Sequence, residues 1–287
     1  MLDFDSKLNI PHTLMCKREM YNELFILSAE TRKDAKVENS TGLWISVIDL
    51  DTLSSEMEDS FVKKYTITYL DEDQNGSDLK RNSRPIDQKL TDIDNPHKIF
   101  ININDTVLVI QSQIWIAIVP LVKDKLSLKP DFEFELQIID KESVFSRYKF
   151  DNWIIESKFH PLSPYTLCIL LNSNQFKMFD ITDSLDIPFY YTCLRPNGGD
   201  PNKGLYRLIS AQDTIVSFDF GNQCALSWQK LTCYFITKDG SIYYLTPLLP
   251  LNFGIEDGFI EKLAMNTKSS KALKYLTLIE AKKQKSK

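Results

Sequence analysis

The sequence predicts an all-β fold, a β-propeller of about four blades followed by a short helical segment at the C-terminal end. Three observations lead to this prediction. A two-strand unit recurs along the chain, its strands are rich in β-branched and aromatic residues bounded by turn residues, and the apolar spacing becomes helical only after residue 256. The 17 Phe and 12 Tyr in 287 residues also fit a β-rich interior, because aromatic rings pack well on a pleated sheet.

The recurring unit is an apolar run, a polar turn, and a second apolar run that ends at Asp or Pro. In chain order the four copies are Glu23–Leu27 with Gly42–Asp49, Thr106–Ile110 with Ile114–Pro120, Leu167–Leu171 with Phe176–Asp180, and Leu231–Ile236 with Ile242–Pro247. Only the first copy has a long polar stretch between its runs, and we expect a polar loop there. Each copy has the chemistry of a β-hairpin.

The turn of the fourth copy has the strongest turn chemistry of the four. It reads Lys238, Asp239, Gly240, Ser241, and glycine accepts the positive φ that tight hairpins require. We expect this turn and the two at 111–113 and 172–175 on the rim of the propeller, where a turn can contact a partner or simply be solvated.

The apolar runs are nearly continuous in hydrophobicity, which predicts strands covered on both faces, as in stacked blades. The hairpins recur at intervals of roughly 60 to 70 residues, longer than the roughly 40–45 residues of WD-type blades. We therefore expect one four-stranded blade with long loops in each interval, and surface loops at 71–95 and 195–202. A jelly roll or sandwich would also be built from such strands, but repetition of the same hairpin favours the propeller.

The chain is predicted to divide into an incomplete set of propeller blades at 1–250 and a helical, basic tail at 251–287. Within the tail, Phe259, Ile260, Leu263 and Ala264 fall at helical spacing. Lysines dominate from residue 268 onward. A solvated helix or a frayed end explains that excess best, and a tail that contacts RNA or a targeting receptor is the alternative.

Composition excludes several classes of function. A net charge of −5 lacks the basic footprint of a dedicated nucleic-acid binder, so we expect no direct nucleic-acid partner. There is no secretory signal, and the longest apolar stretch, 114–122, is too short to cross a bilayer. We expect a soluble intracellular chain with no membrane partner. The five widely spaced cysteines indicate a reducing compartment, with Cys168 and Cys233 as core residues.

No arrangement of residues indicates catalysis or metal binding, so we expect neither enzyme activity nor a cofactor. Each histidine is directly followed or preceded by a proline, and His160, before Pro161, reads as a turn residue with local hydrogen bonds rather than a general base. The acidic stretch 71–76 has the start of a calcium loop, but Asn82 stands where the closing glutamate belongs. No Cys/His ligand pair suits zinc.

Two segments resemble the nucleoporin eighty-two/eighty-eight family. Lys158–Pro164, followed by Leu167–Leu171 and Phe176–Ile181, is similar to one blade of that family, with its His-Pro turn and closing Asp. Leu231–Pro250 is similar to the next blade, which has a Gly-centred turn and an aromatic strand ending in Pro-x-Leu-Pro. Ile114–Pro120 matches the preceding strand, so order and spacing agree over roughly residues 100–260.

The resemblance implies a structural nucleoporin on the cytoplasmic face of the nuclear pore complex, in the nuclear envelope, with a role in messenger-RNA export. Family propellers have seven blades, whereas four hairpin units are present here. The implied partners are other nucleoporins: the C-terminal domain of an autoproteolytic FG nucleoporin, and the tail helix of the FG nucleoporin that recruits the export helicase. The family's Gly-centred docking turn corresponds to Asp239, Gly240 and Ser241.

Two other functions remain open from the sequence alone. An unrelated WD-type propeller adaptor for protein complexes is one, although the Trp-Asp strand ends of that class are missing. A propeller hydrolase is the other, and it would need acids or histidines converging on the axial loops.

Overall fold

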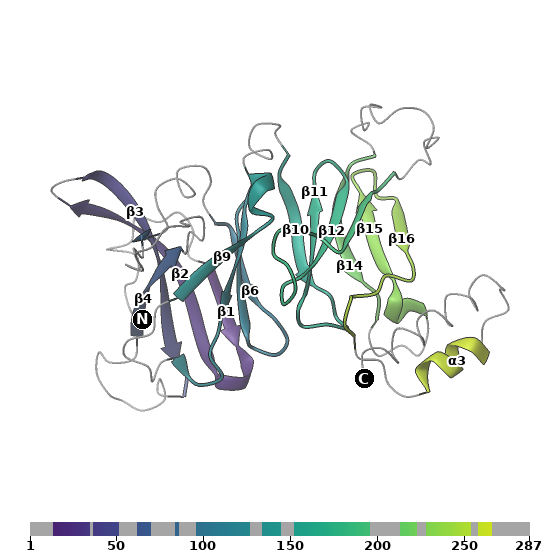
Figure 1. Cartoon of the computed structure of the whole chain (residues 1–287), viewed down its shortest axis with the longest axis horizontal. Helices are drawn as coiled ribbons and strands as arrows, with labels where there is room; N and C mark the ends of the chain where they lie inside the picture. The colour runs from purple at the N-terminus through teal and green to yellow at the C-terminus, as the bar shows by residue number, and fades with distance from the viewer. Residues whose placement is uncertain are drawn as a thin grey trace, which may run out of the picture. The chain divides into compact units, whose positions relative to one another are not determined.

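The computed structural model describes residues 14–34, 37–51, 62–69, 84–85, 96–126, 134–144, 152–195, 213–222, 228–253 and 258–265. The chain forms two compact units, residues 1–148 and 149–287, and each is described by itself (Figure 1).

Unit 1 contains two four-stranded antiparallel blades. The strands of the first blade, in order across the sheet, are β1 (Leu14–Arg18), β2 (Glu23–Asp34), β3 (Val37–Asp49) and β4 (Val62–Tyr69), with the 3-10 helix η1 (Glu19–Tyr21) between β1 and β2. Those of the second blade are β6 (Lys98–Ile101), β7 (Val107–Gln111), β8 (Ile116–Pro120) and β9 (Phe134–Ile139). The outer strands β4 and β9 pair in parallel and join the blades into one sheet, and the short β5 (Arg84–Pro85) pairs with β4.

Unit 2 contains the third and fourth blades. The third blade has the strands β10 (Ile154–Phe159), β11 (Thr166–Leu171), β12 (Gln175–Asp180) and β13 (Tyr190–Cys193), all antiparallel and in sequence order. The fourth blade has β14 (Ile215–Phe220), β15 (Cys233–Thr237) and β16 (Ile242–Leu245), with the 3-10 helix η4 (Trp228–Leu231) before β15. The helix α3 (Phe259–Met265) follows, and its Phe259 and Leu263 pack against Leu231.

The core of unit 1 lies where the strands of its two blades meet. Every residue of β7 is buried, and Trp115, just before β8, is fully buried. Phe25 of β2 contacts Phe134 of β9 edge to face, with ring centroids 6.4 Å apart. β7 is covered on both faces, as its continuous hydrophobic run predicts.

The core of unit 2 is built on three phenylalanines. Phe176 of β12 makes edge-to-face contacts with Phe218 of β14 and Phe235 of β15, at centroid distances of 5.3 and 5.2 Å. Cys168 and Cys233 are fully buried in the same cluster, which confirms their prediction as core residues.

The predicted hairpins are confirmed as β2–β3, β7–β8, β11–β12 and β15–β16. Three details of the sequence prediction are wrong. The expected polar loop of the first hairpin is strand, because the antiparallel ladder continues from Glu23 opposite Asp49 to Asp34 opposite Val37. In the fourth hairpin Leu231 ends η4, so the strand begins at Cys233 instead. The second run of that hairpin, β16, is not covered on both faces.

Several predicted segments lie outside the described residues. They are the loop at 71–95 apart from Arg84–Pro85, the loop at 196–202, and the basic tail from residue 266. The expected boundary between blades and tail at residue 250 therefore stays a prediction, and α3 is the described helix beyond it.

Candidate protein-binding site

The three residues predicted to contact a partner form one tight turn between β15 and β16. Gly240 has a φ of +87°, a conformation that residues with a β-carbon rarely adopt. Its N–H donates to the carbonyl of Thr237 at 2.9 Å, and the N–H of Thr237 donates to the carbonyl of Ser241 at 3.0 Å. The structure thus brings Asp239, Gly240 and Ser241 together at the tip of a hairpin.

The carboxylate of Asp239 holds this turn in shape. Its Oδ1 accepts hydrogen bonds from the Thr237 hydroxyl at 2.5 Å and the Ser241 N–H at 3.0 Å, and its Oδ2 accepts from the Ser241 hydroxyl at 3.2 Å. The bonds from Thr237 and Ser241 lower the pKa of Asp239 from its ordinary value. A carboxylate offers about four acceptor positions, so a partner could still donate a further hydrogen bond.

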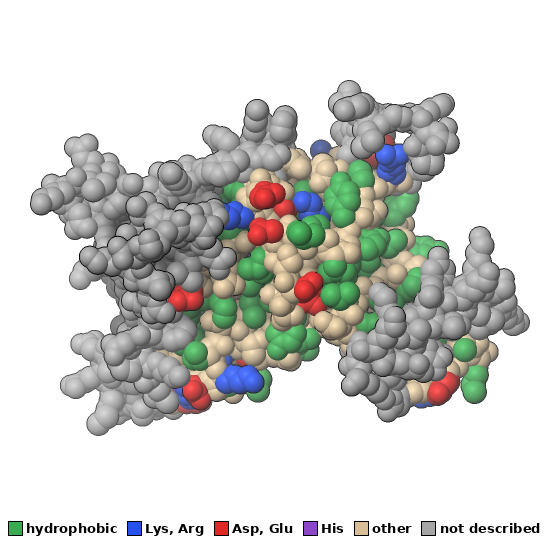
Figure 2. All heavy atoms as spheres, in the orientation of Figure 1, with side chains coloured by type: hydrophobic (Ala, Val, Ile, Leu, Met, Phe, Trp, Pro, Cys, Tyr) green, Lys and Arg blue, Asp and Glu red, His purple; other side chains and the backbone are tan. Residues whose placement is uncertain are grey.

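The strands that lead into this turn carry exposed apolar side chains on one face. Ile236 of β15 lies opposite Ile242 of β16, and Tyr234 lies opposite Tyr244. Ile236 is 43% exposed, Ile242 66% and Tyr244 69%. Hydrophobic side chains lie at the surface where Figure 1 labels β15 and β16 (Figure 2). We call Ile236, Ile242, Tyr244 and the Asp239–Ser241 turn the β16 surface.

Sequence reasoning predicted the turn and the strand of the β16 surface but missed the exposed face of that strand. A run such as Ile242 to Leu245 reads as buried, because apolar residues usually leave water. What distinguishes it from the buried runs is alternation of exposure along the strand, and that depends on what lies beside it.

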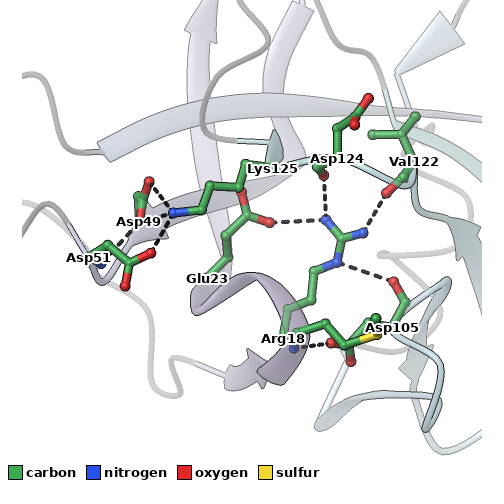
Figure 3. Close-up of polar contacts among 9 residues, drawn as sticks. Arg18, Glu23, Asp49, Asp51, Asp105, Val122, Asp124 and Lys125 are labelled. Atoms are coloured by element: carbon green, nitrogen blue, oxygen red, sulfur yellow. Dashed lines mark hydrogen bonds and ion pairs between the residues drawn. The ribbon is translucent and has the colours of Figure 1, made fainter.

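A buried arginine joins the two blades of unit 1 (Figure 3). Arg18, at the end of β1, donates from Nε to the carbonyl of Asp105 at 3.1 Å and from Nη1 to the carbonyl of Asp124 at 2.8 Å. Nη2 donates to the carbonyl of Val122, and Nη1 also pairs with Glu23 at 3.0 Å. One guanidinium from the first blade thereby fixes two loops of the second.

The aspartate that closes β3 has a structural task next to this arginine. Lys125 Nζ lies 3.1 Å from Asp49 and 2.6 Å from Asp51, as Figure 3 shows. The hydrogen bond from Lys125, followed by that from Asn22, lowers the pKa of Asp51. This second contact ties the β3 end of the first blade to the segment after β8.

A lysine links the two blades of unit 2. Lys158 of β10 donates to the carbonyl of Phe218 in β14 at 2.8 Å and pairs with Glu156 at 3.2 Å. Glu156 in turn accepts from the Ser217 hydroxyl at 2.6 Å. Both units therefore use an ionic side chain aimed at the neighbouring blade, which suits a rigid scaffold.

The histidine between β10 and β11 has structural hydrogen-bond partners. His160 accepts at Nδ1 from the Leu162 N–H at 3.1 Å, while Nε2 lies 3.3 Å from the carbonyl of Leu248. Burial lowers the pKa of His160 to about 4. The Nδ1 contact confirms the prediction of a turn histidine with a local hydrogen bond, whereas the Nε2 contact reaches a residue 88 positions away and was not predicted. Within the described ranges, no three His, Cys, Asp or Glu side chains gather as metal ligands would.

A search for relatives supports the family resemblance. The nuclear pore complex protein NUP88 of Arabidopsis thaliana is 28% identical over 97 residues, which make up 34% of this chain and 11% of that protein. No protein-family model matches the chain.

Two solved nucleoporin complexes contain chains with a similar fold. One is the Chaetomium thermophilum heterotrimer of the Nup82 NTD, the Nup159 TAIL and the Nup145N APD, with a TM-score of 0.61 at 14% identity. The match covers 88% of this chain and 45% of that one. The other is the yeast Nup82–Nup159–Nup116 complex, with a TM-score of 0.50 at 15% identity over 98% of this chain and 56% of that one. The chain thus spans about half the length of the solved chains it matches.

These likenesses confirm two predictions from the sequence, the propeller fold and the resemblance to the Nup82/Nup88 family. Among the helices of the described residues, none has the length and apolarity to span a membrane.

Proposed function

We propose that the chain is a structural nucleoporin, a non-enzymatic scaffold that binds other nucleoporins. The observation that carries this proposal is the blade architecture. Over 88% of the present chain, it matches a chain of the Nup82 complex with a TM-score of 0.61. Sequence similarity to NUP88 supports the same role independently of the fold.

The proposed location is the cytoplasmic face of the nuclear pore complex, with service in messenger-RNA export. The proposed partners are the C-terminal domain of an autoproteolytic FG nucleoporin and the tail helix of the FG nucleoporin that recruits the export helicase. Support comes from the two solved complexes, in which a Nup82 chain assembles with Nup159 and with Nup145N or Nup116.

The rigidity of the blades supports a scaffold role. A partner that binds a preorganised surface loses less free energy to ordering than one that binds a mobile loop. The Arg18 and Lys158 contacts fix neighbouring blades in each unit, and the Asp239 carboxylate fixes the turn of the β16 surface. We propose Asp239, Gly240 and Ser241 as part of the docking surface for one of these nucleoporins.

Direct binding tests the proposal. The purified chain is titrated with the Chaetomium thermophilum Nup159 tail and, separately, with the Nup145N domain, and the heat of binding is measured. We expect at least one of the two to bind. Asp239→Arg, which reverses the charge and breaks the turn's hydrogen bonds, is expected to weaken that binding at least tenfold.

Asp183→Arg is the matched control, because Asp183 is also an exposed aspartate in a turn of unit 2. Equal loss of affinity in both variants would remove the Asp239–Ser241 turn from the docking surface. Failure of the wild-type chain to bind either nucleoporin, together with absence of a tagged chain from the nuclear rim in cells, would contradict the proposed function as a whole.

A further inference from the structure

Within the described part of unit 2, the position beside β16 in the fourth blade is open. In the first, second and third blades, a fourth strand pairs with the third: β4 with β3, β9 with β8, and β13 with β12. The fourth blade runs β14–β15–β16, and no strand of the described residues pairs with the far edge of β16. Figure 1 shows β16 as the last strand of this sheet.

The segment that follows β16 turns away from this position. The Thr246 hydroxyl donates to the carbonyl of Leu231 at 3.5 Å, and the Leu248 N–H donates to the same carbonyl at 2.8 Å. The carbonyl of Leu248 then lies 3.3 Å from Nε2 of His160. These contacts turn the segment after β16 back over the end of the sheet, so this segment does not continue into the fourth-strand position.

The far edge of β16 presents backbone groups suited to pairing. The N–H of Thr237 donates to the carbonyl of Ser241, so Ser241 and, two residues on, Tyr243 direct their backbone groups toward β15. In an antiparallel ladder the intervening residues direct theirs the other way. Ile242 and Tyr244 therefore point their N–H and C=O groups away from the sheet, and their side chains are 66% and 69% exposed.

We propose that this edge binds an extended segment of a partner protein, which pairs antiparallel with β16 and completes the fourth blade. Strand addition of this kind gains affinity from main-chain hydrogen bonds and specificity from alternate side chains. The outer strands of this chain already accept additional strands, since β4 pairs with β9 across two blades. The inference goes beyond the proposed function, because it would hold for a scaffold at any cellular location.

The chemistry of the partner segment follows from its neighbours. Side chains directly opposite Ile242 and Tyr244 would be aromatic or β-branched, because such cross-strand pairs stabilise a sheet. Two of the three other fourth strands have this composition: β4 reads Val-Lys-Lys-Tyr-Thr-Ile-Thr-Tyr and β13 reads Tyr-Tyr-Thr-Cys. Beside the turn, Asp239 disfavours an acidic residue at that end of the segment.

A second copy of this chain is a poorer occupant than an extended segment. β16 has only four residues, and two folded copies paired through strands this short would bury far less than the roughly 1,000 Å² of a specific protein interface. An extended segment can follow β16 and cover the exposed side chains of Ile242 and Tyr244.

The test uses a fluorescein-labelled synthetic peptide with the sequence of Val62–Tyr69, titrated with the full chain while anisotropy is measured. Tyr244→Pro removes the outward N–H and should weaken binding at least tenfold. Tyr244→Ala keeps that N–H and should weaken binding less than Tyr244→Pro does. Tyr191→Ala, on the exposed part of β13, is the matched control and should bind as the wild type does. Thermal unfolding verifies that the variants fold.

Hydrogen exchange on the wild-type chain keeps the test independent of the variants. The amide of Tyr244 should exchange fast in the free chain and become protected with the peptide, while that of Tyr243 should be protected in both. Absence of peptide binding, equal binding by Tyr244→Pro, or protection of Tyr244 through concentration-dependent dimerisation would each overturn the proposal. A chain that binds this peptide but no nucleoporin would keep this inference and contradict the proposed function alone.

Discussion

Arg18 and Glu23 form an ion pair of 3.0 Å in which both side chains are completely buried. Removing two charges from water is costly, and the cost is recovered only where every remaining donor and acceptor is satisfied. Arg18 meets this condition through three backbone carbonyls of the second blade. The pair therefore holds Arg18 in place as a contact between the two blades and helps to fix their relative orientation within unit 1.

Breaking this pair should destabilise unit 1 strongly. Arg18→Met leaves the Glu23 carboxylate buried without its cation, and we expect the free energy of unfolding to fall by about 3–5 kcal/mol. Urea unfolding followed by tryptophan fluorescence measures this, since Trp115 lies in the same unit. The double variant Arg18→Met/Glu23→Leu should lose less than the single one, because it also removes the buried carboxylate. A double variant as unstable as the single would contradict this account.

The Asp239 carboxylate should support its turn only while it is ionised. Hydrogen bonds lower its pKa, so its contribution to stability is present above the pKa of the unfolded chain, about 3.9. This contribution is lost as the pH falls through the lower folded value. Asp239→Asn should thus lower the melting temperature at pH 7, and the difference from the wild type should shrink below about pH 4.

Asp183→Asn provides the comparison for that experiment, since it also removes one exposed carboxylate from a turn of unit 2. The melting temperature of this control should change less than that of Asp239→Asn at pH 7. A difference between wild type and Asp239→Asn that stays constant from pH 7 to pH 3 would show that the carboxylate does not hold the turn.

Much of this fold can be predicted from the sequence because hairpins are local. The two apolar runs of a hairpin and the turn between them, such as that at Gly240, are adjacent in the sequence. The strands therefore paired as expected. The contact of Arg18 with the second blade could not be predicted in this way. Its partner carbonyls lie 87 to 106 residues away in the chain, and a carbonyl carries no sequence signal because every residue has one.

The β16 surface shows a second limit of sequence reasoning. Ile242 and Tyr244 have the same apolar character as the buried β7 and β11. Their exposure depends on what packs over that face of β16, which the sequence of β16 does not encode. The prediction for the first hairpin was wrong in the opposite way: it gave a loop where the structure has strand. The antiparallel ladder extends through a polar stretch that lacks hydrophobic alternation.

The buried cysteines should be chemically inert in the folded chain. Burial raises the pKa of Cys168 and Cys233 well above the ordinary value, and it raises the pKa of Cys16 to about 12. Because the thiolate is the reactive form, a disulfide reagent at pH 8 should modify the exposed Cys193 quickly and the other three slowly.

The cysteine experiment is made in a Cys224→Ser background, so that only the four described thiols remain. Adding Cys193→Ser should abolish the fast phase, and urea should then make the three remaining thiols reactive. A fast phase that survives Cys193→Ser would mean that Cys16, Cys168 or Cys233 is accessible to the reagent.

His160 should make stability fall as the solution becomes acidic. Its pKa is about 4 in the folded chain against an ordinary value of 6.5, so between these pH values the unfolded state binds the proton more readily. Stability therefore rises with pH across this window. A shift of this size corresponds to about 3 kcal/mol between pH 7 and pH 4.

Urea unfolding at a series of pH values separates this effect from that of the carboxylates. His160→Asn keeps a side-chain acceptor for the Leu162 N–H but cannot bind a proton, so its stability should depend less steeply on pH between about 6.5 and 4 than that of the wild type. His97→Asn changes an exposed histidine and should keep the wild-type slope. If His160→Asn kept that slope as well, then the buried imidazole could not be the group that takes up the proton on unfolding.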